Sequence, residues 1–411
     1  MNGNYKYCPC NHRWTGFFLG VISRRIREWN FSEPFAALIV GVLLSSAGFD
    51  FLDLKLFNPW ILEEAARLSL AVGVMGVALR IPSSYIIKNW RSIAAMLGII
   101  MPFMWIMNSL LVYWLLDFNF LTALLLGAIM TPTDPILAVS IVSGQLAKDK
   151  LPERLRDLIS VESGSNDGLA YPFVLLPILW MAHRPEEALN HWVINTLFWE
   201  VGVAVILGAL IGYTAGHILR KAQSKKTIDE SSYVAYTLSL TFLTLGGIKL
   251  IGSDGILAVF VAGVFFSATS TEKERRDEKR VVEGSDRFFT IPIFALLGLA
   301  LPWQEWGKLG LEGLTLALLI LILHRIPILF SIKPLVSNLK NSLDVLFTGW
   351  FGPIGVAALY YVRLSMRQTG IEELWPVVSL VICMSIVLHG ITATYFTKLY
   401  GKYNPEKSGN G

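Results

Sequence analysis

A cluster of polar side chains stands inside a strongly apolar stretch of the sequence. The segment VESGSNDGLAYPFVLLPILW (161–180) contains Glu162, Ser163, Asn166 and Asp167 directly before a run of apolar residues. On a helix, Ser163 and Asp167 share one face and Glu162 and Asn166 share the adjoining face, because each pair is four residues apart. An ionisable group deep in a bilayer costs at least about 2.5–3.5 kcal/mol, so two carboxylates at this depth indicate a function.

A second polar sequence, MTPTDPILAVS (130–140), interrupts another apolar run. Pro132 and Pro135 each remove a backbone donor and clash with the preceding turn, so the helix is predicted to unwind there. Non-helical backbone at membrane depth is tolerated only inside protein or beside water. The freed carbonyl oxygens, that of Thr133 among them, suit a hard cation, and Asp134 adds a carboxylate at the centre. We interpret this break as functional rather than as a simple kink.

The segment TGWFGPIGVAAL (348–359) contains a matching break at Gly352 and Pro353. Two interrupted segments at corresponding positions in the two halves of a chain indicate a transporter built from inverted repeats. In such transporters the binding site lies between the broken helices, near the middle of the membrane.

One cation is expected near the middle of a membrane segment. Arg325 in LILHRIPIL (321–329) has apolar residues on both sides. Arginine does not lose its proton, so it needs a fixed anion, and the candidates are Glu162, Asp134 and Asp167. The carboxylate that pairs with Arg325 stays ionised and takes no part in proton exchange.

The composition places these residues in a membrane protein. Of 411 residues, 54% are hydrophobic and 16% charged, and the mean hydropathy is +0.53, whereas soluble domains are roughly 25% charged. The predicted fold is an all-α polytopic membrane protein with about thirteen transmembrane helices, in two inverted six-helix repeats with broken crossing helices in segments 5 and 12. In the alternative with twelve spans, the first segment lies at the interface. The predicted segments are 13–28, 34–47, 61–80, 92–116, 121–143, 157–181, 193–219, 231–250, 255–268, 286–301, 310–330, 345–362 and 374–397.

The basic residues predict an orientation for these segments. One set of alternate loops holds 25 of the 35 Lys and Arg residues, the other set holds eight, and Arg67 and Arg325 fall inside segments. Cytoplasmic loops carry such an excess, so the C-terminus is predicted to be cytoplasmic. We interpret residues 1–411 as one membrane transport domain, with a core at about 34–397 and a short cytoplasmic tail at 398–411.

Six motifs occur in an order that identifies a family resemblance. They are TPTDP, the E-S-x-x-N-D pattern in VESGSNDG, GSDGILAVFVAGV, HRIPI, GWFGPIGVA and VLHGITATY. In this order they resemble the monovalent cation/proton antiporter family, and most of all its NhaP-type sodium/proton branch of bacteria and archaea. The resemblance covers residues 34 to 397. It implies a multi-pass protein of the cell (inner) membrane, active in pH homeostasis, and a homodimer formed through the first segments.

The resemblance also implies roles for single positions. Asp167 resembles the carboxylate that binds either the cation or the proton, and Ser163 and the Thr133 backbone resemble further ligands of the monovalent cation. Asn166 resembles the amide found in electroneutral members. Asp134 is expected to belong to the same site and to support the broken helix. Glu162 and Arg325 resemble a buried structural ion pair.

Two positions depart from the family pattern. The family often has an arginine in a GPRG segment, where this chain has Ile354. Some archaeal members supply a glutamate from the third segment, and LSLAVGVMGVALR (68–80) has none. The missing arginine changes the electrostatic setting, and the missing glutamate leaves fewer acidic oxygens for the cation.

The predicted function is antiport of Na+ (or Li+) against H+, electroneutral and one for one, by alternating access with competition for Asp167. A six-helix bundle of segments 4–6 and 11–13 is expected to move against the rest. The alternatives are a K+/H+ antiporter, a cation channel, and an intramembrane aspartyl protease using Asp134 and Asp167, although the chain lacks a GxGD sequence. We expect no enzyme activity, no cofactor besides the transported ions and no nucleic-acid partner. The sequence also shows no phosphate-binding glycine loop.

Overall fold

A computed structural model describes residues 32–45, 47–49, 59–134, 137–138, 145–225, 232–269 and 288–404. The predicted segment at 13–28, the residue Pro135 and most of the polar 267–287 loop lie outside these residues. Within the described ranges every regular element is helical, as the sequence predicts. The principal helices are α2 (Glu33–Leu44), α3 (Pro59–Arg80), α4 (Ser83–Lys88), α5 (Trp90–Ala95), α6 (Met101–Leu116), α7 (Phe120–Ile129), α9 (Gln145–Lys150), α10 (Glu153–Ala182), α11 (Pro185–His191), α12 (Val203–Ser224), α13 (Ser232–Leu250), α14 (Gly255–Thr269), α16 (Trp303–Leu323), α17 (Ile326–Ile332), α18 (Ser342–Trp350), α19 (Val356–Thr369) and α20 (Leu374–Tyr403).

Five helical stretches are long and apolar enough to cross a membrane. Among the described residues these are 90–116, 185–224, 232–250, 303–335 and 374–403, and four shorter apolar helices accompany them. One of the shorter helices, Phe288–Leu299, precedes α16. α3 and α10 are also long enough, at 22 and 30 residues, but both contain buried carboxylates. The chain therefore has the all-helical build of a membrane protein.

Both predicted interruptions occur at the expected residues. α7 ends at Ile129 and residues 131–134 are not helical, and α18 ends at Trp350 with α19 beginning at Val356. A third interruption was not predicted. The segment expected to be continuous over 310–330 breaks at His324 and Arg325, because Pro327 in the first turn of α17 cannot donate to the preceding turn.

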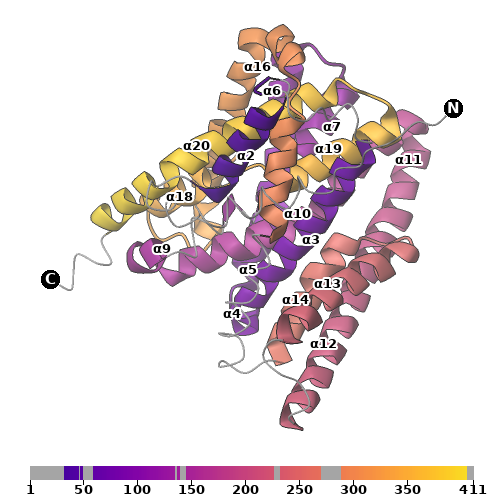
Figure 1. Ribbon diagram of the computed structural model, residues 1–411, viewed down its shortest axis with the longest axis vertical. Coiled ribbons are helices and arrows are strands. Elements are labelled where there is room, and N and C mark those ends of the chain that lie inside the picture. The colour runs from indigo at the N-terminus through magenta and orange to yellow at the C-terminus, as the bar shows by residue number, and fades with distance from the viewer. Residues whose placement is uncertain are drawn as a thin grey trace.

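α10 lies at the centre of the helices that surround the polar residues. It contacts α3, α7, α14 and α19, and Figure 1 shows α12, α13 and α14 at one edge of the molecule, away from α16 and α20. Two glycines allow the close approach of neighbouring helices to α10. A Cβ at Gly168 would collide with the backbone of Leu257 on α14, and one at Gly164 would collide with Val77 on α3. Small residues at such contacts are typical of packed membrane helices.

Candidate functional site

Asp167 lies halfway along α10 and is fully buried. Its exposed fraction is 0%, and neither carboxylate oxygen has a hydrogen-bond partner among the described residues. A charge buried without a partner is strongly unfavourable, so this carboxylate needs either a proton or a cation. Ser163 lies one turn before it on the same face, and its hydroxyl donates to the carbonyl of Ile159 at 2.8 Å. The Ser163 oxygen keeps lone pairs that can bind a cation.

Asn166 connects α10 to the first broken helix. Its Nδ2 donates to Thr133 Oγ1 at 2.8 Å and to Glu162 Oε1 at 3.0 Å. Its Oδ1 accepts from the backbone N–H of Thr133 at 3.2 Å. The amide therefore has contacts on both of its polar atoms, and it holds the non-helical backbone against α10 immediately beside Asp167.

Arg325 forms an ion pair with Glu162, one of its three candidate partners. The Nη2 of Arg325 donates to Glu162 Oε2 at 2.8 Å, and both side chains are buried. The Thr133 hydroxyl lies 3.5 Å from the same oxygen. A Cβ at Gly352 would collide with the Arg325 side chain, so a glycine in the second break makes room for the guanidinium. The charge of Glu162 is therefore balanced within the protein.

Asp134 joins the two broken helices. Its backbone N–H donates to the carbonyl of Pro353 at 2.6 Å, so the two non-helical segments cross in direct contact. Its Oδ2 accepts from the N–H of Val356 at 2.5 Å, and its Oδ1 accepts from the N–H of Leu137 at 3.2 Å. A Cβ at Gly355 would collide with this carboxylate. Asp134 thus caps α19 and the chain that follows the first break, where helix N-termini favour a negative charge.

Polar side chains satisfy backbone groups that the two breaks leave free. At the first break, Asn108 Nδ2 donates to the carbonyl of Met130 at 3.1 Å. At the second break, Ser385 Oγ accepts from the N–H of Ile354 at 2.8 Å, and His389 Nε2 lies 2.8 Å from the carbonyl of Trp350. Unwound backbone at membrane depth requires such partners. His389 lies in the VLHGITATY motif, whereas Asn108 and Ser385 belong to none of the quoted motifs.

The chain matches one family model over almost its whole length. Residues 15–399 match the family described as "Sodium/hydrogen exchanger, transmembrane". The chain belongs to the sodium/hydrogen exchanger family.

Similar exchangers come from fungi, bacteria and an archaeon. The "Na(+)/H(+) antiporter" of Schizosaccharomyces pombe is 34% identical over 361 residues, covering 82% of this chain and 77% of that protein. The "Na(+)/H(+) antiporter 2" of Zygosaccharomyces rouxii is 32% identical and covers 85% of this chain, which spans about half (48%) of that relative's length. A "K(+)/H(+) antiporter NhaP2" of a Shewanella strain is 26% identical over 289 residues, 70% of this chain and 48% of that protein.

The fold resembles that of an archaeal exchanger. The structure titled as the sodium proton antiporter MjNhaP1 of Methanocaldococcus jannaschii superposes with a TM-score of 0.73 and 16% identity, over 95% of this chain and 96% of that chain. At this identity the likeness establishes the fold alone. The predicted family is confirmed, and so is the all-helical membrane class.

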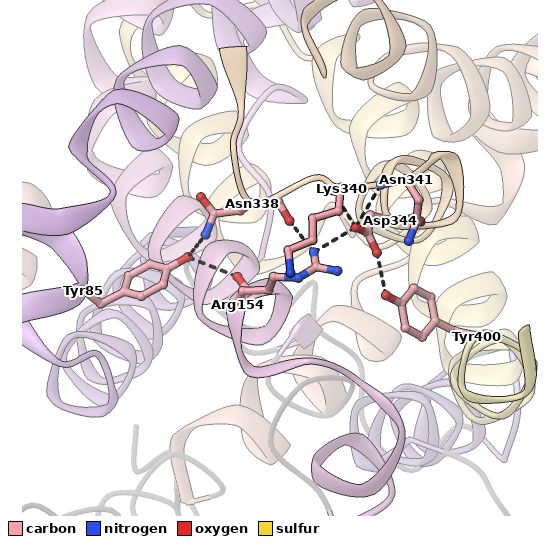
Figure 2. Close-up of polar contacts among 7 residues, drawn as sticks. All are labelled: Tyr85, Arg154, Asn338, Lys340, Asn341, Asp344 and Tyr400. Atoms are coloured by element: carbon pink, nitrogen blue, oxygen red, sulfur yellow. Dashed lines mark hydrogen bonds and ion pairs between the residues drawn. The ribbon is translucent and has the colours of Figure 1, made fainter. Parts of the chain in front are cut away.

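A second polar cluster lies at the N-terminal ends of α10 and α18. The sequence did not predict this cluster. Figure 2 shows Arg154 and Tyr400 both pointing at Asp344. Asp344 Oδ2 accepts from Arg154 at 2.8 Å and from the N–H of Lys340 at 2.7 Å, and Oδ1 accepts from Tyr400 at 2.5 Å. Asp344 also completes a capping box with Asn341. The N-S-L-D spacing of that box was the available signal.

Tyr85 extends this cluster to α4. Its hydroxyl donates to the carbonyl of Arg154 at 3.1 Å and accepts from Asn338 Nδ2 at 2.8 Å (Figure 2). Arg154 also donates to the carbonyl of Asn338. Burial and the nearby Asp157 carboxylate raise the pKa of Tyr85, so its hydroxyl keeps the proton that it donates. The cluster therefore joins α4, α10, α18 and α20 at one end of the bundle.

Proposed function

We propose that this chain is a secondary antiporter that exchanges Na+ (or Li+) for H+ across a membrane. The observation that carries the proposal is Asp167, a fully buried carboxylate with both oxygens unpartnered among the described residues, beside two crossed, broken helices. The fungal relatives are named as Na+/H+ antiporters, which supports sodium as the cation.

One carboxylate can couple the two ions by competition. Burial disfavours the charged, empty form of Asp167, and either a proton or a cation removes that cost. When neither the empty charged site nor a doubly loaded site crosses the membrane, exchange is obligatory. Ser163 and the Thr133 backbone are the proposed additional oxygen ligands of the cation.

The surrounding charges support a stoichiometry of one for one. Glu162 is balanced by Arg325, and residue 166 is an uncharged amide. Asp134 accepts two backbone N–H groups at helix N-termini. Asp167 is then the single titrating charge that moves, so the exchange carries no net current.

We infer that transport proceeds by alternating access between two groups of helices. The broken helices and α10 belong to the moving bundle, and the two halves of the chain are proposed inverted repeats with α12 in the linker. A homodimer through the first segments and a cytoplasmic C-terminus complete the proposal. The inner membrane of a bacterium is one proposed location, and the fungal relatives extend the choice to other membranes.

Ion exchange in proteoliposomes tests the proposal. Purified protein is reconstituted with a trapped pH indicator, a pH gradient is imposed, and Na+, Li+ or K+ is added separately. We expect Na+ and Li+ to collapse the gradient without a membrane potential, and Asp167→Asn to abolish this response. Collapse of the gradient by the Asp167→Asn protein would show that Asp167 is not the coupling residue.

A K+/H+ antiporter is the second candidate, because the Shewanella relatives, at 26–27% identity, are named as K+/H+ antiporters. The same assay separates the candidates. A response to K+ that exceeds the response to Na+ at equal concentration would favour this alternative. Single-channel currents in a planar bilayer would instead indicate a cation channel.

A further inference from the structure

A second pair of carboxylates lies close to the C-terminal half of α10. Tyr171 is one turn after Asp167 on the same face, about 6 Å along the helix axis. Its hydroxyl donates to Glu200 Oε1 at 3.3 Å. Glu200 belongs to the helical stretch between α11 and α12, so this contact joins that stretch to α10 directly beside the proposed transport site.

Asp254 is fixed next to Glu200. Its backbone N–H donates to the carbonyl of Glu200 at 3.2 Å, and the hydroxyl of Ser253 donates to the same carbonyl at 2.6 Å. The Oδ1 of Asp254 accepts from the N–H groups of Ile256 and Leu257, at 2.9 and 3.1 Å, and so caps α14. The chain therefore holds the two acidic residues together through its backbone.

The other oxygen of Asp254 is buried without a partner. The residue is 6% exposed, and Oδ2 has no hydrogen bond among the described residues. The carboxylate interacts electrostatically with Glu200 and with the hydroxyl groups of Tyr171 and Tyr361. Oδ2 is thus a bare acceptor beside a second carboxylate, which is the arrangement that a cation would complete.

Two tyrosine hydroxyls connect this pair with Asp167. Tyr171 contacts Glu200 as described, and Tyr361 is fully buried and donates to the backbone carbonyl of Asp167 at 2.5 Å. Tyr361 also interacts electrostatically with Asp254 and with Asp167. Tyrosine hydroxyl groups therefore contact both Glu200 of the carboxylate pair and the backbone of Asp167.

Glu63 and Glu64 on α3 have cationic partners, whereas Asp254 and Glu200 have none among the described ion pairs. His191 is the basic group that interacts with Glu200, and it lies at the end of α11. Lys249 is near α3 and interacts with the charged groups there. The paired acids are Glu63 with Arg367, at 2.9 Å, and Glu64 with Arg67.

We propose that Asp254 and Glu200 form an outer monovalent-cation site that loads Asp167 from the side of the membrane opposite Arg154. The proposal rests on the proposed antiport function. Arg154 lies in the first turn of α10, whereas Tyr171 lies beyond Asp167 towards the other end of that helix. The basic-residue pattern assigns the turn at 250–255 to the non-cytoplasmic side.

Sided transport measurements test this proposal. Membrane vesicles of each orientation are prepared from cells that express the full chain, and the apparent KM for Na+ is measured from each side. Two carboxylates close together raise the local cation concentration and the rate of loading, so we expect Asp254→Asn and Glu200→Gln each to raise the KM about tenfold from the non-cytoplasmic side. From the other side we expect less than about a twofold change. Asn still caps α14, and Gln still accepts from Tyr171, so both variants keep the local contacts.

The matched control is Glu187→Gln, which removes an exposed carboxylate from α11 at the same end of the molecule. We expect it to leave the KM unchanged from both sides. An unchanged KM in both test variants, or an equal rise from both sides, overturns the outer site while leaving the antiport function intact. Absence of Na+-dependent exchange in the parent protein would instead contradict the antiport function itself.

Discussion

Asp167 and Asp344 are both completely buried aspartates, yet their surroundings are opposite. Asp344 accepts hydrogen bonds from Arg154, Tyr400 and two backbone N–H groups, while Asp167 accepts none from the described residues. A buried carboxylate with a full set of partners fixes the elements around it. A buried carboxylate without partners depends on an ion supplied from outside. The protein thus uses aspartate in two ways: Asp344 is a structural contact between helices, and Asp167 is the proposed ion-binding residue.

Asp134 has hydrogen-bond partners, as Asp344 does, although it lies in the broken helix beside α10, which carries Asp167. Both of its oxygens accept backbone N–H groups, and its own N–H binds the opposing break. Glu162 is likewise occupied, by Arg325 and Asn166. Of the three acidic side chains around the crossing, Asp134, Glu162 and Asp167, only Asp167 lacks a partner among the described residues. Asp167 is therefore available to bind a transported ion.

The largest expected effect is the loss of exchange in Asp167→Asn. The amide cannot release a proton or balance a cation, so we expect Na+-dependent proton flux to fall at least about 100-fold. Removing an unpartnered buried charge costs no hydrogen bond, so the Tm in detergent is expected to stay within about 3 °C of the parent protein or to rise. A large drop in Tm would mean that Asp167 has structural partners, as Asp344 does.

The next effect concerns the buried ion pair. Glu162→Ala alone strands the Arg325 guanidinium in an apolar interior and is expected to destabilise the fold by about 3–5 kcal/mol. The double variant Glu162→Ala, Arg325→Ala removes both charges and is expected to recover part of that loss. Thermal unfolding in detergent of the two variants and the parent measures the difference. Equal Tm values for Glu162→Ala and the parent would contradict the structural role.

The sequence predicted the helix breaks where the local residue types determine them. Pro132, Gly352 and Pro353 each disfavour a continuous helix, so both interruptions followed from the sequence. The family followed from six motifs in order, and the comparisons confirm it. The break at His324 was missed, because the flanking residues are apolar enough to continue a helix on either side.

The contacts between distant segments could not be predicted in the same way. The sequence left three anions open for Arg325, and only the tertiary fold brings Glu162 on α10 to Arg325, which directly precedes α17. The contacts of Asp344 with Arg154 and Tyr400 join residues 190 and 56 positions apart, without any spacing pattern. Asn166 was predicted from the resemblance as a site residue, and its role in cation binding remains a proposal beside its observed contacts with Thr133.

A smaller loss of stability is expected when the hydrogen bonds of Asp344 are removed. Asp344→Ala leaves two backbone N–H groups, the Tyr400 hydroxyl and Arg154 without their acceptor, but Arg154 is 16% exposed and can reach water. We expect a loss of about 2–4 kcal/mol, read as a lower Tm in detergent. Glu153→Ala is the control, because it removes an exposed carboxylate from the adjacent position of α10. Similar Tm values for the two variants would show that the cluster does not stabilise the fold.

The smallest expected effect is that of Asp134→Asn, which tests whether Asp134 caps a helix or binds the cation. Asp134→Asn keeps one acceptor oxygen for a helix N-terminus and places an amide N–H₂ against the other N–H group. We expect a cost of about 1–2 kcal/mol, because one backbone donor loses its acceptor, with little change in the KM for Na+. Asparagine is itself a good N-cap residue, which limits the loss. If Asp134 instead binds the cation directly, the KM for Na+ rises severalfold while the Tm stays close to that of the parent. Measuring the KM for Na+ and the Tm on one preparation shows whether Asp134 has a structural role, as Asp344 does, or binds the cation, as is proposed for Asp167.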